Sequence, residues 1–106
     1  MGARRSFRSA TRMASPWRRR TMCVLITDLP MPATLRNVSA VGAFLETNAR
    51  PALGTGVELH HPEAGAIAGR VDALATDGIS IGFDVCEQSV AFALAAISAD
   101  MSRPAA

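Results

Sequence analysis

The stretch that decides the fold is LRNVSAVGAFLE, residues 35–46, in which two short apolar runs flank a polar turn. Asn37 and Ser39 can hydrogen-bond the backbone or a ligand across a tight bend. Gly42 permits either a positive φ angle or the close approach of another group. We therefore predict that residues 33–38 and 43–47 form two strands joined at this turn.

Further short strands are predicted on both sides of the turn, with turn signals about every ten residues. Residues 22–26 are rich in apolar side chains and end at a predicted loop, Asp-Leu-Pro-Met-Pro, over 28–32. Residues 57–60 and 67–74 alternate apolar and polar side chains, as half-buried strands do. Thr76-Asp77-Gly78 predicts a hairpin with a primed turn leading into the strand 79–83. Six such strands are typical of a small antiparallel barrel or sandwich.

A helix is predicted after the last strand. Val90, Leu94, Ile97 and Met101 recur at helical spacing, which favours an amphipathic helix of about fourteen residues. Such a helix is marginal alone, so we expect it to lie on the barrel or on a partner. Asp84 and Glu87 could form a capping box at its start.

Charge is divided unevenly along the 106 residues, which are enough for one domain. Residues 1–20 hold seven arginines and no acid, whereas the remainder holds four arginines and nine carboxylates. We predict a flexible arginine-rich N-terminal arm over 1–20, a folded unit over 21–101 and a frayed tail over 102–106. Arginine suits bidentate contacts with phosphate, so the arm favours an anionic ligand; a solvated tail is the plainer alternative.

The cysteines and histidines give no indication of catalysis or metal binding. Cys23 and Cys86 are isolated and are predicted to be buried small hydrophobes in a reducing compartment. His60 and His61 would point to opposite strand faces, so no metal or other cofactor is expected. No catalytic constellation stands out, and we expect no enzyme activity.

No apolar run approaches the roughly 18 residues of a membrane helix, and the arm lacks the core of a secretory signal, so a cytoplasmic protein without a membrane partner is expected. The composition of the arm also resembles that of an organellar transit peptide.

The order of these features resembles the PilZ domain family. The shared features are an arginine-rich arm, a strand, a loop, the turn Asn37-Val38-Ser39-Ala40-Val41-Gly42 opening a strand, and a barrel that ends in a helix. Residues 69–71 (GRV) and 81–84 (IGFD) also resemble the last two strands of the family. The resemblance covers roughly residues 4–100. It implies an all-β fold, a six-stranded antiparallel β-barrel with a C-terminal helix, and binding of cyclic di-GMP in bacterial second-messenger signalling.

The resemblance also implies a binding site shared between the turn and the arm. Asn37 and Ser39 would hydrogen-bond guanine or phosphate, and Gly42 would let the backbone come close. The second motif of the family is Arg-x-x-x-Arg close before the first strand. By spacing it matches Arg8 and Arg12, or Arg4 and Arg8; by position it matches the adjoining cluster. Both alignments stay open, so the set of ligand-binding residues implied is Arg8, Arg12, Arg18, Arg19, Arg20, Asn37, Ser39 and Gly42.

Three other interpretations stand beside this one. The turn can be purely structural, with Asn37 satisfying backbone groups. The chain can be a PilZ-like interaction module that does not bind the nucleotide and acts on a protein partner through the helix or the exposed strand faces. Nucleic-acid binding through the arm would show a steep dependence on salt, but the acidic remainder of the chain and the lack of interleaved aromatic residues argue against it.

Overall fold

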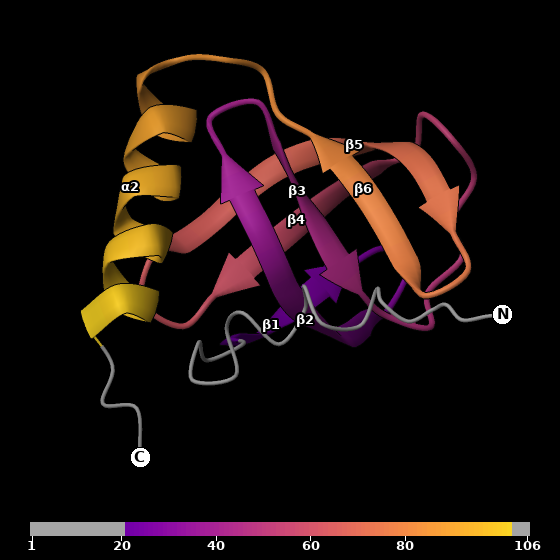
Figure 1. The fold of residues 1–106 in the computed structure, drawn as a ribbon. Helices are drawn as coiled ribbons and strands as arrows, with labels where there is room; N and C mark the ends of the chain where they lie inside the picture. Colours follow the sequence, from indigo (N-terminus) through magenta and orange to yellow (C-terminus); the bar gives the residue numbers. More distant parts are fainter. Residues whose placement is uncertain (1–20, 103–106) are drawn as a thin grey trace, which may run out of the picture.

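The computed structural model describes residues 21–102, in which six antiparallel strands close into a barrel followed by one helix (Figure 1). The strands neighbour one another in the order β1-β2-β3-β6-β5-β4, and β4 pairs with β1 to close the barrel. The predicted fold class is therefore confirmed. The elements are β1 (Thr21–Ile26), β2 (Pro30–Ser39), β3 (Gly42–Glu46), β4 (Gly56–His61), β5 (Gly65–Ala75), β6 (Gly78–Gly82) and α2 (Glu87–Ser102).

The barrel interior is filled by aliphatic side chains that alternate with exposed ones along the strands. In β4, Val57 and Leu59 are buried while Glu58 and His60 are exposed, so the predicted two-residue period is confirmed. Alternation places every second side chain inside, and closure gives each of the six strands a neighbouring strand on both sides. The largest fully buried side chains of the core are Cys23, Leu25, Leu45, Leu59, Ile79 and Ile81.

β2 starts earlier than predicted. The segment Pro30–Pro32 is the beginning of the strand rather than part of a loop, because Pro30 pairs with Ile26 and Pro32 with Val24 of β1. On the other side of β2, pairing with β3 begins only at Thr34. Prolines lack an N–H, so they are tolerated where a strand has a neighbour on one side only.

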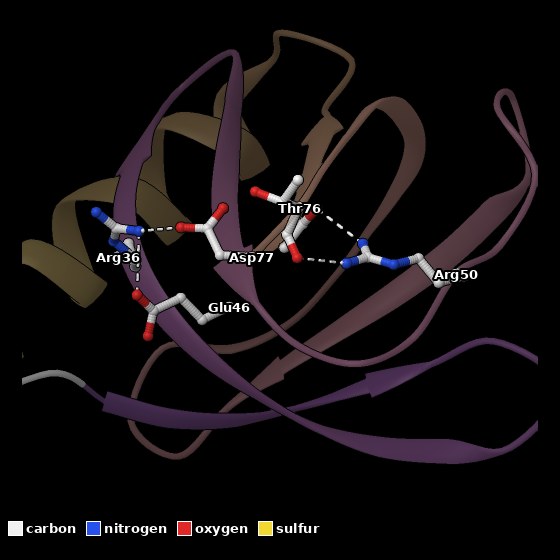
Figure 2. A network of polar contacts seen from close by, with 6 residues as sticks. Arg36, Glu46, Arg50, Thr76 and Asp77 are labelled. Carbon is white, nitrogen blue, oxygen red and sulfur yellow. Dashed lines mark hydrogen bonds and ion pairs between the residues drawn. The ribbon is translucent and has the colours of Figure 1, made fainter.

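The hairpin between β5 and β6 is confirmed, but its predicted primed turn is wrong. Ala75 pairs with Gly78 across a two-residue loop, and within residues 21–102 only Gly54 and Gly65 have positive φ. The guanidinium of Arg50 holds this loop in place, donating to the carbonyl of Gly78 at 3.1 Å and to that of Thr76 at 2.9 Å (Figure 2). A Cβ at Gly78 would collide with the carbonyl oxygen of Leu45, so this glycine is required for packing rather than for its φ angle.

α2 packs against β2 and β5 with a face that the sequence pattern did not indicate. The ring of Phe92 meets those of His61 and Phe83 edge-on, with centroids 6.0 and 5.8 Å apart. Ala93 and Ala96 are buried beside it, because small side chains let the helix backbone approach the barrel closely. The predicted apolar stripe does not lie on the barrel and is exposed at Val90, Leu94, Ile97 and Met101.

The N-terminus of α2 is capped by Cys86 and Ser89. The N–H of Cys86 donates to Ser89 Oγ at 2.9 Å, and this hydroxyl donates to the carbonyl of Cys86 at 3.0 Å. The pair has the three-residue spacing of a capping box, but it begins two residues later than the predicted pair Asp84 and Glu87. Asp84 instead accepts from Arg70 at 3.1 Å. Within residues 21–102, no helix has the length and hydropathy needed to span a bilayer.

The two cysteines differ in environment. Cys23 is buried in the core, as predicted, but Cys86 is exposed, so the predicted burial of Cys86 is wrong. Burial disfavours the thiolate and raises the pKa of the Cys23 thiol to about 11.

We expect the two thiols to differ strongly in alkylation. At pH 8 iodoacetamide should label Cys86 of the folded chain, whereas Cys23 should react only after denaturation, because reaction requires both access and thiolate. Mass spectrometry of peptides from folded and guanidinium-treated protein measures both sites. The Cys86→Ser variant serves as control, since it should take up no label while folded. Labelling of Cys23 in folded Cys86→Ser protein at pH 8 would show that β1 does not close over this thiol.

Candidate functional site

A bulge in β2 brings Arg36 and Asn37 to the same face of the barrel. The register of β2 against β3 shifts between Leu35 and Asn37, so that Asn37 pairs with Phe44. Leu35 is buried inside the barrel, while Arg36 and Asn37 are both exposed. An extra residue in one strand breaks the alternation and re-aims side chains. Both polar side chains therefore lie outside, beside the ring of Phe44.

The predicted turn lies directly after this bulge. Ser39 is exposed, and its Oγ accepts the N–H of Val41 at 3.2 Å. The carbonyl of Val41 accepts the N–H of Phe83 at 2.9 Å, which fixes the turn to the segment after β6. The hydroxyl of Ser39 thus has a structural role, although a hydroxyl has three hydrogen-bonding positions and this bond uses one.

Gly42 has a packing role. Its φ angle is not positive, and a Cβ there would collide with the carbonyl oxygen of Ile81 in β6. Of the two predicted possibilities, the close approach of another group is confirmed and the positive φ angle is wrong. Gly42 pairs with Gly82, where a Cβ would meet the carboxylate of Asp72. Because both paired residues are glycines, no side chain projects from this pair on the outer surface beside Ser39, and the carboxylate of Asp72 lies next to it.

Arg36 is the centre of a polar network that the sequence analysis missed (Figure 2). Its Nη1 lies 3.0 Å from a carboxylate oxygen of Glu46 in β3 and 3.0 Å from one of Asp77 in the β5–β6 loop. The guanidinium carbon also lies 5.4 Å from the centroid of Phe44, within the range of a cation–π contact. Arg36 and Glu46 both lie in the quoted stretch and meet in the β2–β3 hairpin, whereas Asp77 becomes a neighbour only when β6 pairs with β3.

The described part of the chain has little positive charge to offer an anion. All nine carboxylates of the sequence lie within residues 21–102, together with only three arginines. Arg36 and Arg70 are paired with carboxylates, and Arg50 donates to backbone carbonyls. The arginines proposed as ligand contacts lie in residues 1–20, outside the described residues, namely Arg8, Arg12, Arg18, Arg19 and Arg20.

The start of β1 lies close to the bulge. Thr21, the first described residue, pairs with Leu35, which directly precedes Arg36 and Asn37. Any path that residues 1–20 take therefore begins beside these two side chains. A separate groove of about 540 Å³, lined by residues within 27–31 and 48–55, contains none of the predicted site residues.

Comparisons with models of known protein families, with curated proteins and with solved structures find no match to this chain.

Substituting Gly42 is expected to weaken the fold whether or not a ligand is present. Gly42→Ala places a methyl group against the carbonyl of Ile81, and such overpacking costs about 1–3 kcal/mol. Urea unfolding followed by circular dichroism measures the loss. Gly56→Ala is the matched control, because a Cβ at this exposed strand glycine meets nothing within 4 Å. Equal midpoints for the two variants would contradict the close approach of β3 and β6.

Proposed function

We propose that this chain is a cyclic di-GMP sensor of the PilZ type, with a site shared between the outer face of β2 and β3 and the arginines of residues 1–20. One observation carries the proposal more than any other: the arm joins the barrel at Thr21, opposite Leu35 and beside Arg36 and Asn37. An arm that entered at the far end of the barrel would begin a full strand length away. Arg20 directly precedes Thr21 in the sequence, so the arm is attached at the end of β1 that pairs with this part of β2.

The chemistry of the ligand fits this division. Cyclic di-GMP presents two phosphates and two guanines. Arginine guanidinium groups bind phosphate oxygens and the O6/N7 edge of guanine in a bidentate manner, and their planes stack on bases. The amide of Asn37 has both donors and an acceptor, and Ser39 has a hydroxyl, so both side chains can form hydrogen bonds with the polar edge of a base.

The charge distribution makes the arm necessary for binding. The barrel holds more carboxylates than arginines, and Asp72 lies over Gly82 beside the turn. A doubly negative ligand on this face would be repelled unless the arm supplied cations. Ligand binding would therefore order the arm over β2 and β3, which is the change that a sensor reports to a partner.

Calorimetry with cyclic di-GMP on the full chain tests the proposal. The triple variant Arg18→Ala/Arg19→Ala/Arg20→Ala should lose affinity by more than about 100-fold, because each charge-assisted contact contributes about 1.5–3 kcal/mol. Asn37→Ala should lose about tenfold through its neutral hydrogen bonds. Arg103→Ala is the control: it also removes one arginine, but one that follows α2 in the sequence instead of preceding β1.

The double variant Arg8→Ala/Arg12→Ala decides between the two alignments of the arginine motif. A loss in this variant, with the triple variant unaffected, would place the motif by its spacing rather than by its position. Unchanged affinity in every arm variant and in Asn37→Ala would remove the proposed site.

A second candidate function is the interaction module that does not bind the nucleotide. The observation that favours it is the engagement of every described arginine by a carboxylate or a carbonyl, which leaves the site dependent on the arm alone. No heat of binding with the full-length wild-type chain would favour this function over the first.

A further inference from the structure

The outer face of α2 is an apolar stripe without a partner in the described chain. The exposed fractions are 42% for Val90, 61% for Leu94, 40% for Ile97 and 78% for Met101. These four side chains are more than a third of the eleven large hydrophobic residues exposed in residues 21–102. No charged residue occurs from position 88 to position 99. A stripe of this kind marks a contact surface more often than a solvated face.

The stripe cannot be buried by turning the helix. The opposite face is fixed on the barrel by Phe92, whose ring meets His61 and Phe83, and by the cap that buries Ser89. Turning the stripe inward would expose Phe92, Ala93 and Ala96. Only another molecule or a segment outside the described barrel could therefore cover the stripe.

The spacing of the stripe is that of a coiled-coil seam. The intervals from Val90 to Leu94, Ile97 and Met101 are four, three and four residues, which is the 3.5-residue repeat of alternating a and d positions. The residues beside the seam, Ala91, Ala95 and Ser98, are small and uncharged, so a second helix can come close. A seam of this type is complementary to another copy of itself.

We propose that two copies of this chain associate through α2, with the two helices antiparallel about a two-fold axis between Leu94 and Ile97. This arrangement places Val90 opposite Met101 and Leu94 opposite Ile97, so that a small side chain faces a large one and two of equal size face each other. It also separates Glu87 and Asp100 from the same residues of the second copy. A parallel pair would bring these like charges together and align the two helix dipoles.

Charge and area both favour a second copy over the arm of the same chain. The arm carries seven arginines, and the stripe offers them no carboxylate between positions 88 and 99. The stripe and its small neighbours present on the order of 500 Å² per copy, so the pair would bury about 1,000 Å², the lower end for a specific interface. The dimer should therefore be weak and reversible, and this proposal does not rest on the proposed nucleotide site.

Sedimentation velocity of the full chain from about 1 µM to about 500 µM tests the association, since micromolar dissociation constants are expected of a small interface. The wild-type chain should shift from monomer to dimer with concentration. Leu94→Glu should weaken the dimer by at least about 100-fold, because the seam has no cation to pair with a buried carboxylate. Leu53→Glu is the control, an equally exposed leucine in the β3–β4 connection.

A monomer at every concentration, as expected if the arm or an unrelated protein covers the stripe, would overturn the proposal. A dimer that persists in Leu94→Glu would overturn it equally. Circular dichroism of each variant checks that the barrel is intact, which exposed positions should allow.

Disulfide trapping tests the antiparallel geometry. In a Cys86→Ser background, a chain carrying Val90→Cys is mixed with one carrying Met101→Cys and oxidised. Antiparallel helices bring these two positions together, so a mixed disulfide should dominate. In a parallel pair the eleven-residue offset would separate the two positions by about 16 Å, too far for a bond. Products that contain only identical chains would therefore overturn the arrangement.

Discussion

Closure of the barrel depends on how closely β3 and β6 approach each other, and a glycine at each end of their pairing makes this possible. At one end the missing side chain of Gly42 leaves room for the carbonyl of Ile81; at the other end that of Gly78 leaves room for the carbonyl of Leu45. A methyl group at either position would force the strands apart. Because a closed barrel has no edge, losing this pairing would leave the sheet with two exposed edge strands, as would the loss of any other of its six pairings.

The outer face follows from the same closure. The register of β2 against β3 shifts between Leu35 and Asn37, and this shift leaves Arg36 and Asn37 both exposed on the side of Phe44. Closure also brings the β5–β6 loop beside β3, so that Asp77 and Glu46 can share the guanidinium of Arg36 (Figure 2). The exposed polar surface is thus a product of strand register rather than of any local motif.

The sequence predicted the elements better than it predicted their contacts. Two-residue alternation identified β4, and the turn signals located the hairpins, because both depend on residues that are adjacent in the chain. The bulge was missed because it exists only relative to β3. The first residues of β2 were assigned to a loop because they include two prolines. A proline is acceptable in a strand where a neighbouring strand is absent on one side, and the sequence does not reveal where that is the case. Likewise, the sequence of residues 1–20 does not indicate where these residues lie relative to the barrel.

The orientation of α2 was left open for a different reason. Large aliphatic side chains at helical spacing were expected to face either the barrel or a partner, and on the barrel side a large ring flanked by alanines fills the space instead. A helix with one aromatic and several alanines on one face, and four aliphatic residues on another, has two faces that can be buried. The period of the pattern identified the helix correctly but could not decide between these faces.

β2 is the physical link between the two proposed surfaces. Its residues carry the bulge and the turn, and the same strand contacts α2. A ligand that orders the arm against β2 would change the environment of a strand on which the helix rests. Any coupling between nucleotide binding and helix pairing would be reciprocal, so that association of two copies would alter ligand affinity by the same factor. The net-acidic barrel opposes an anionic ligand and the basic arm attracts it. Under the proposed function, the cations that draw the ligand to β2 therefore come from the arm and not from the barrel.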